Sequence, residues 1–325
     1  MDEAKYHLRE LVDTDYKSVA RIWTENDPQS PFSEEEVRHL FQRMDGPRFV
    51  RHRRSIVEIG SDEVVAVGFL RQDGITFDPE FARAAVTVDP AHQHQGLGRR
   101  LFEDLEAAAR AQGLKGLWAG VRTQDPRSVR FFERAGFREK RRQWVSRLEV
   151  KDAQVELDPR APGRWAADGI AFTTVEEEGP GRPEVRERLY RLYLDTIKEV
   201  PRLGGLTDST FEEFVRMIFE DAGFLPEAIF LARVGDAYVS FTALNRRVAE
   251  PGALYISFTG TLAPYRGRGL ANELKRRSID FARNHGYRYI ETDNDSENEQ
   301  IWSINQKQGF RQFRVWIMGE KLFPT

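Results

Sequence analysis

The sequence contains no cysteine among its 325 residues. This absence excludes disulfides, thiolate metal sites and a cysteine nucleophile. It also lacks any run of about 18 apolar residues, so we expect no membrane-spanning helix and no membrane partner. The segment Met1–Glu10 carries charges throughout and has no apolar core of the kind that a signal peptide needs. These absences predict a cytoplasmic protein.

An excess of charge of one sign is also missing. The formal net charge is −3 and the isoelectric point is about 6.2, which predicts no nucleic-acid partner. Only six histidines occur, and His92 and His94 have no further histidine or carboxylate at ligand spacing. We therefore expect no metal site. The length predicts two domains, because a typical domain has roughly 150 residues.

The chain contains an internal repeat. The segment from His92 to Phe137 aligns without a gap to the segment from Tyr265 to Phe310, at an offset of 173 positions, with eight identities. The identities include Gly96 with Gly269, and they fall mostly at glycines and apolar positions. The stretch around 157–165 is rich in Pro and Gly and lacks periodicity, which is typical of a linker. We predict domains at 1–155 and 169–325, joined by a linker at 156–168.

Each half has the same predicted order of elements: an opening strand, two helices, a run of three strands, a glycine-bearing loop and a helix. The strand runs are expected at 55–59, 64–70 and 84–88, and again at 228–234, 237–244 and 254–261. Capping boxes are expected at Ser33 with Glu36 and at Ser209 with Glu212. We expect the acidic stretch 293–299 to be a polar loop. The pattern predicts a mixed α/β sheet, made twice.

A strand, a glycine loop and a helix N-terminus together form a cradle for an anion, because backbone N–H groups and the helix dipole point at the ligand. The alternative is a turn without a ligand, which two matching loops disfavour. Neither loop has the lysine and hydroxyl of a P-loop, and both lack the third glycine of a Rossmann fingerprint. A phosphate-containing ligand of another kind is therefore expected.

At these residues the chain resembles the GNAT acetyltransferases, whose pyrophosphate loop reads [QR]-x-x-G-x-[GA]. The first half matches from Gln93 to Gly98 and the second from Arg266 to Ala271. Part of the family's late motif is found at 125–137 and again at 298–310. The resemblance covers both halves and is greatest to tandem members, which include mycothiol synthase-like proteins. It implies two GNAT-type domains, each a mixed, mostly antiparallel sheet flanked by helices.

The resemblance implies that acetyl-CoA, or another acyl-CoA, is the co-substrate, with no metal. Backbone amides would hold its pyrophosphate, the free edge of the preceding strand would pair with its pantetheine arm, and two further polar residues would lie beside that arm. The residues concerned are Gln93, His94, Gln95, Gly96, Leu97, Gly98, Arg99, Val86, Val88 and Asp125 in the first half, and Arg266, Gly267, Arg268, Gly269, Leu270, Ala271, Asn272, Thr259, Thr261 and Asn298 in the second.

The implied reaction is direct attack of a neutral amine on the thioester, assisted by a base and an acid. The family's acid is often a tyrosine four residues before the late glycine, but here those positions hold Phe132 and Asn305. Asn305 can donate a hydrogen bond and is the candidate there. Glu80, just before the strand at 84–88, is the candidate base, and a solvated loop glutamate is the alternative reading.

Taken together, the residues and the resemblance predict an N-acetyltransferase that acts on a primary amine of a small molecule or peptide. One alternative is a non-catalytic acyl-CoA sensor or scaffold, which the missing tyrosine favours. Another is a protein with one active and one structural half. Because single-copy relatives often pair, we expect the fused copies to form an internal pseudo-dimer and the protein to be a monomer.

Overall fold

The computed structural model describes residues 5–72, 77–154, 158–201, 203–204 and 207–324. Its first half contains, in chain order, β1 (Tyr6–Glu10), α1 (Tyr16–Asn26), α2 (Glu34–Arg43), β2 (His52–Glu58), β3 (Glu63–Arg71), β4 (Phe81–Val88), α3 (Leu97–Ala111), β5 (Gly116–Arg122), α4 (Pro126–Arg134) and β6 (Arg138–Glu149).

The second half repeats this order with two additional helices, one before its first strand and one directly after that strand. It contains α5 (Ala161–Ala167), β7 (Ile170–Thr174), α6 (Val175–Glu178), α7 (Pro183–Ile197), α8 (Phe211–Ile218), β8 (Phe224–Val234), β9 (Ala237–Arg246), β10 (Ala253–Thr261), α9 (Leu270–Asn284), β11 (Tyr289–Asp295), α10 (Glu299–Lys307) and β12 (Arg311–Leu322). The mixed, mostly antiparallel architecture is the fold class that the sequence predicts.

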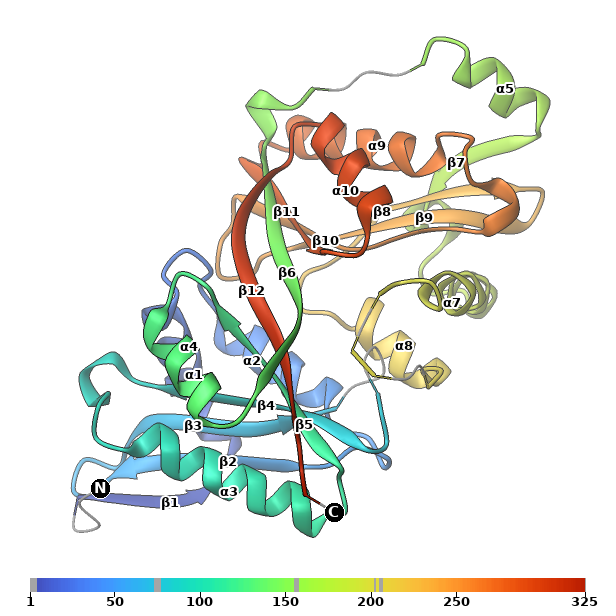
Figure 1. The fold of residues 1–325 in the computed structure, drawn as a ribbon. Helices are drawn as coiled ribbons and strands as arrows, with labels where there is room; N and C mark the ends of the chain where they lie inside the picture. The colour runs from blue at the N-terminus through green and yellow to red at the C-terminus, as the bar shows by residue number, and fades with distance from the viewer. Residues whose placement is uncertain (1–4, 73–76, 155–157, 202, 205–206, 325) are drawn as a thin grey trace.

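All twelve strands form one continuous sheet, in the order β1-β2-β3-β4-β5-β12-β6-β11-β10-β9-β8-β7. Only β4 with β5 and β10 with β11 pair in parallel, and the other neighbours are antiparallel. The last strand of the chain, β12, lies between β5 and β6, while β6 pairs with β11 of the second half (Figure 1). Each half is therefore completed by the final strand of the other.

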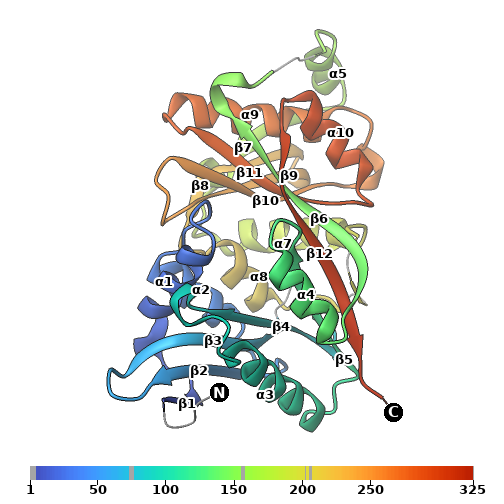
Figure 2. The same ribbon diagram turned by 60° about the vertical axis from the view of Figure 1, so that its left-hand side comes forward.

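Helix periodicity explains how each half closes its core. In α3 the apolar residues Leu97, Leu101, Leu105 and Ala109 recur at helical spacing and are buried against the sheet. In the second half, both α9 and α7 pack on the strands β9 and β10. In both views α7 and α8 lie between the second half's sheet and the first half (Figure 2).

Three expectations meet the structure differently. Ser33 and Glu36 form the predicted capping box, but the second box is formed by Thr210 and Glu213 rather than by Ser209 and Glu212. Helix α8 begins one residue later because Thr210 is the last extended residue before it, and Glu213 also binds Arg48 of the first half at 2.9 Å. The cap and the contact between the halves thus use the same carboxylate.

The acidic stretch 293–299 is only partly a loop. Strand β11 continues to Asp295, so Asp293 and Asp295 lie on the sheet between β6 and β10. Cross-strand pairing to Trp144 and Gln143 of β6 extends the strand beyond what the local polarity indicates.

Within the range predicted as linker, residues 156–157 lie outside the described residues. Residues 161–167 form helix α5, whose Ala161 and Trp165 are buried against Leu270 of the second half. This segment therefore packs on the loop region that precedes α9.

Candidate functional site

The two glycine-bearing loops adopt the same backbone conformation. In the second loop Gly267 and Gly269 have left-handed φ angles of 72° and 79°. In the first, His94 and Gly96 occupy the matching positions with φ angles of 64° and 81°. A non-glycine residue held there costs free energy, so the conformation has a purpose beyond chain reversal. Left-handed residues at alternate positions turn successive backbone N–H groups toward one concave side, directly before a helix N-terminus.

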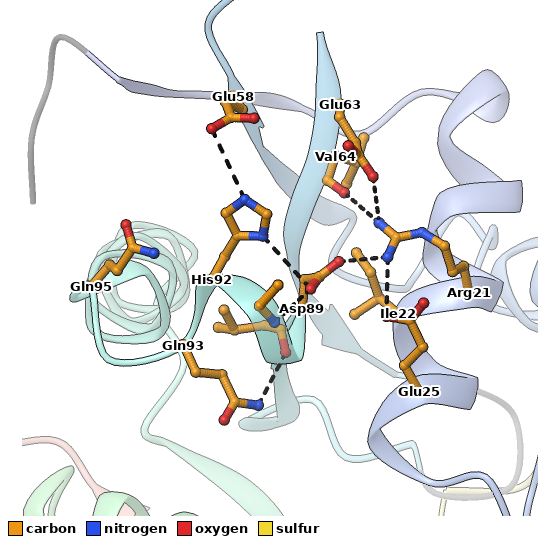
Figure 3. Close-up of polar contacts among 12 residues, drawn as sticks. Arg21, Ile22, Glu25, Glu58, Glu63, Val64, Asp89, His92, Gln93 and Gln95 are labelled. Atoms are coloured by element: carbon orange, nitrogen blue, oxygen red, sulfur yellow. Dashed lines mark hydrogen bonds and ion pairs between the residues drawn. The ribbon is translucent and has the colours of Figure 1, made fainter. Parts of the chain in front are cut away.

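The first loop is braced by a polar network that Figure 3 shows. Asp89 caps the short turn 90–92 by accepting a hydrogen bond from the backbone N–H of Ala91, and Arg21 of α1 binds the same carboxylate at 2.5 Å. Burial alone would raise the pKa of Asp89, but Arg21, the Ala91 N–H and His92 hold it below its ordinary value. The Gln93 side chain donates to the carbonyl of Val88 at 3.4 Å.

The second loop is braced by different side chains at equivalent places. Arg266, at the position of Gln93, donates to the carbonyl of Thr261 at 3.1 Å and forms an ion pair with Glu199 at the end of α7. Behind the loop, the indole N–H of Trp165 donates to the carbonyl of Arg268 at 2.9 Å. The side chains of the motif therefore hold the loop in place and leave its backbone amides to meet a ligand.

Each loop stands beside a pair of parallel strands that separate. Pairing of β4 with β5 ends at Arg83 with Trp118, and pairing of β10 with β11 ends at Ile256 with Thr292. Beyond these points the strands of each pair lose their hydrogen-bonded register, and β10 has an irregularity between Ile256 and Phe258. Each half therefore has an opening in the sheet that leads from its glycine loop.

The predicted edge residues lie at these openings but are engaged differently. In the first half, Val86 and Val88 pack against α3, and the Val88 carbonyl also accepts a hydrogen bond from the amide of Asn26 at 3.0 Å. In the second half the hydroxyl of Thr261 lies 2.7 Å from that of Ser240. The hydroxyl of Thr259 in the same strand accepts a hydrogen bond from Thr242 at 3.2 Å.

Asp125 and Asn298 both cap a helix at the far side of an opening. Asp125 accepts hydrogen bonds from the backbone of Arg127 and Ser128, and Asn298 accepts one from Ile301. Burial acts to raise the pKa of Asp125, but the hydroxyl of Ser128 and these backbone donors hold it below its ordinary value. Both residues therefore fix the start of α4 and α10.

The interiors of the two halves differ most at one trio of positions. The first half has a stack of Phe102, Phe132 and Phe137, with ring centroids 5.0 and 5.7 Å apart. The second half has Lys275, Asn305 and Phe310 at the matching positions, with the Lys275 ammonium donating to Asn305 Oδ1 at 2.7 Å.

Both polar members of this second trio are sealed inside the protein. Lys275 is 1% exposed and Asn305 is 0% exposed. Burial lowers the pKa of Lys275 to about 7. Two buried amide nitrogens, Nδ2 of Asn305 and Nδ2 of Asn294, have no hydrogen-bond partner among the described residues. Unpaired buried donors are rare, and they mark places where an absent ligand or water is expected to bind.

On the opposite face of the same opening, Asp293 accepts a hydrogen bond from the hydroxyl of Tyr255. The surrounding protein raises the pKa of Asp293, with Glu291 adding to the effect, although the side chain keeps access to solvent. Burial raises the pKa of Tyr255 well above its ordinary value, and the charge of Asp293 adds to this effect. In the described part of the chain no cationic group lies within ion-pair distance of Asp293, unlike Glu291, which binds Arg147.

Glu80 lies at the other end of its strand from the glycine loop. It directly precedes β4, where β4 and β5 are still paired, and its exposed carboxylate forms an ion pair with Lys115. Its assignment as a base stays a prediction.

Two residues of the second opening, Lys275 and Asn294, were not predicted from the sequence, and Asp293 was expected only as part of a polar loop. The 173-residue offset aligns Lys275 with Phe102 and Asn294 with Val121, both apolar. A polar residue at a position where the repeat places an apolar one was the signal available.

Two further absences are observed. Across the residues that the structure describes, no group of three or more His, Asp or Glu side chains is arranged to hold a metal ion. Over the same residues, no helix combines the length and the apolarity needed to cross a bilayer.

Comparison with protein families gives two matches along the chain. The model of the acetyltransferase (GNAT) family matches residues 16–137 and, separately, residues 188–310. Each match contains one glycine loop and one opening of the sheet.

Individual relatives agree with this family match. N-alpha-acetyltransferase 30 of Schizosaccharomyces pombe is 28% identical over 104 residues, which is 30% of this chain and 69% of that protein. The ribosomal protein bS18 alanine N-acetyltransferase of Escherichia coli K12 is 39% identical over 54 residues, which is 17% of this chain and 36% of that protein. The fold is that of a tandem GNAT protein from the clavulanic acid biosynthesis pathway, with a TM-score of 0.75 at 17% identity over 99% of this chain and 100% of that chain.

Proposed function

Because the chain belongs to the acetyltransferase (GNAT) family through both of its halves, we propose that it transfers an acetyl group from acetyl-CoA to a primary amine of a small molecule or peptide. The observation that carries this proposal is the loop-and-opening unit of the second half. It combines a left-handed glycine loop at a helix N-terminus with buried amide donors that lack partners. The curated relatives, which are named as N-acetyltransferases, support an amine acceptor.

The residues of the second half fit acyl-CoA as the co-substrate. The backbone N–H of Arg266 donates to Ala263, so the amides from Gly267 to Asn272 are the ones that would meet the pyrophosphate. The opening beyond Ile256 and Thr292 leaves strand edges unpaired, which suits an extended arm bearing amides. Asn294 and Asn305 supply donors inside that opening.

The first half is less suited to the same ligand. The edge carbonyls do not separate the halves, because Val88 accepts a hydrogen bond from Asn26 at 3.0 Å and Thr261, its equivalent, accepts one from Arg266 at 3.1 Å. Phe132 stands where the second half has the donor Asn305. We therefore assign catalysis to the second half and a mainly structural role to the first.

Asp293 is the base in this proposal. Its pKa is raised above the ordinary carboxyl value, which makes the carboxylate a stronger base than an ordinary one. Tyr255 holds the carboxylate by a hydrogen bond, and Arg247 and Arg314 act on Asp293 through their charge without forming an ion pair with it among the described residues. Solvent access at Asp293 gives the removed proton a way out.

Calorimetry with acetyl-CoA on the wild type, Gly96→Glu and Gly269→Glu tests the proposal. A glutamate at either left-handed glycine introduces strain and a negative charge at the pyrophosphate position. We expect Gly269→Glu to abolish binding at the second half and Gly96→Glu to leave that binding intact. Absence of acetyl-CoA binding in the wild type would refute the acetyltransferase assignment, and loss only with Gly96→Glu would move the site to the first half.

The two halves also bear on assembly. Since β6 and β12 are exchanged within one chain, the pseudo-dimer is internal, and we propose a monomer of 37.6 kDa. Light scattering that reports twice this mass would contradict it.

A further inference from the structure

Lys275 is a cation buried without an anion. Its side chain is 1% exposed, and its ammonium donates a hydrogen bond to the neutral Asn305 at 2.7 Å. Burial is the sole cause of its lowered pKa, so no carboxylate of α9, α10 or the sheet compensates its charge. The nearest acid on its helix, Glu273, is paired with Arg276 and Arg277. Retaining such a group is costly for stability, which points to a function.

The internal repeat places Asn305 at the opening of the sheet. In the first half the ring of Phe132 lies directly over Gly319 of β12, which pairs with Ala119 one residue past the end of the β4–β5 pairing. The equivalent pair in the second half is Ser146 with Thr292, the last β11 residue paired with β10. Asn305 therefore sits over the point where β10 and β11 separate.

The hydrogen bond also sets which way the Asn305 amide faces. An ammonium has only donors, so the oxygen of Asn305 must face Lys275. The Nδ2 group then faces away from the lysine, and it is buried without a partner among the described residues. Asn294 accepts a hydrogen bond from the Ser146 hydroxyl through Oδ1 at 2.5 Å, and its Nδ2 has no partner among the described residues. The second half thus presents two buried donors, Nδ2 of Asn294 and Nδ2 of Asn305.

We propose that Lys275 and Asn305 form a donor pair that stabilises the thiolate of CoA as it leaves the acetyl group. The proposal rests on the proposed function of the second half. The Lys275–Asn305 pair supplies what a phenylalanine or an asparagine alone cannot, which is a positive charge behind a hydrogen-bond donor. Both interactions are strengthened in the buried interior.

The lone pair of the amine nitrogen forms the new bond to the acetyl carbon, and Asp293 takes the amine proton. The carbon–sulfur bond breaks, and its electron pair stays on sulfur. Asn305 Nδ2 donates a hydrogen bond to that sulfur, while the Lys275 ammonium, through Asn305 Oδ1, compensates the negative charge. CoA departs as the thiolate and takes its proton from water.

The test needs no acceptor amine, because CoA itself carries the thiol whose ionisation is measured. In a Gly96→Glu background, the thiol of bound CoA is titrated by its ultraviolet thiolate absorbance, with the complex of desulfo-CoA as the blank. The protein has no cysteine, so the difference signal belongs to CoA. Because a bound thiolate favours the ammonium form of Lys275 above its ligand-free pKa of about 7, the two groups titrate as a pair. We expect the bound thiol to titrate at least about one pKa unit below free CoA, which corresponds to about tenfold tighter binding of the thiolate than of the thiol.

Lys275→Met separates this role from a structural one. Methionine keeps the length of the side chain and removes the charge, so we expect the thiol shift to disappear while the affinity for desulfo-CoA stays unchanged. Lys307→Met, an exposed lysine of α10, is the matched control and should keep the full shift. Calorimetric Kd values for CoA and desulfo-CoA give the same comparison independently.

The outcomes separate the two proposals. If CoA binds but its thiol titrates as in free solution, or if the shift survives in Lys275→Met, the donor pair is refuted and the acetyltransferase site stands. If neither CoA nor desulfo-CoA binds, the proposed function fails with it. Asn305→Leu should lose the shift as Lys275→Met does, and a retained shift in that variant would also overturn the proposal.

Discussion

Asp27, at the end of α1 in the first half, forms an ion pair at 2.6 Å with Arg314 of the chain's last strand. The same carboxylate binds Arg122 of β5 at 3.1 Å, and Arg314 also reaches Glu291 of β11 at 3.3 Å. One acid of the first half thus joins both halves at the place where β12 enters the sheet. Since these groups are largely buried, removing one partner leaves an uncompensated charge inside.

The strand exchange predicts that neither half folds alone. Residues 1–154 lack β12, which pairs with β5, and residues 158–325 lack β6, which pairs with β11. We expect each fragment, expressed separately, to give the poorly dispersed amide spectrum of an unfolded chain. Co-expression should restore a stable one-to-one complex, because the broken link lies outside the exchanged strands. A monomeric, cooperatively folded fragment would contradict the topology.

Lys275 makes stability depend on pH. Its folded pKa is about 7 and its unfolded value is about 10.5, so between these values the unfolded chain holds a proton that the folded chain has released. Unfolding then takes up a proton, and the free energy of unfolding rises with pH across this window. Urea denaturation between pH 7 and about 10 should show this rise in the wild type and a flatter profile in Lys275→Met.

The same variant is expected to be more stable than the wild type near neutral pH. Replacing a buried, uncompensated cation with an apolar side chain of similar length removes the cost of desolvating that cation. A variant that gains stability and loses the thiol shift identifies a group retained for function. Destabilisation by Lys275→Met would instead indicate that the lysine is needed for packing.

Asp293→Asn should remove the base without disturbing the fold. Once an acceptor amine is identified, we expect a fall in kcat/KM of about 10²- to 10⁴-fold, the usual contribution of a general base. The wild-type rate should rise with pH through the raised pKa of Asp293, and this limb should vanish in the variant. Tyr255→Phe removes the hydrogen bond that favours the carboxylate form, so it should shift the limb to higher pH. An unchanged profile in both variants would exclude Asp293.

Trp165→Phe tests how the second loop is braced. The substitution keeps the ring packing and removes the hydrogen bond to the Arg268 carbonyl, a loss of about 1 kcal/mol. We expect the Kd for acetyl-CoA to weaken about fivefold. Tyr6→Phe, which removes the 2.8 Å hydrogen bond to Gln95 beside the first loop, is the matched control. Equal weakening by both variants would mean that the first half contributes to the same site.

Local patterns carried much of the prediction. Gly96 and Gly269 indicate left-handed turns, and short, mostly apolar runs bounded by turn residues locate β3 and β9, because both signals depend on neighbours in the chain. Periodicity also assigns α3 and α9, whose apolar residues recur every three or four positions. The sequence did not predict the positions at which a polar residue is buried by elements that are distant in the chain. Lys275 stands beside Arg276 and Arg277 and reads as part of a solvated helix face.

The sequence by itself determined that the chain is made twice, where each glycine loop lies, and that no thiol of its own interferes with that of CoA. Those features follow from residue identity and short-range backbone preference. Only the tertiary structure decided that β6 and β12 change places, since both strands follow the same motif and pairing partners are chosen by contacts far apart in the chain. It also decided that Lys275 faces Asn305 in a dry interior while Phe102 and Phe132 fill the same space in the other half, because burial is a property of the packed whole.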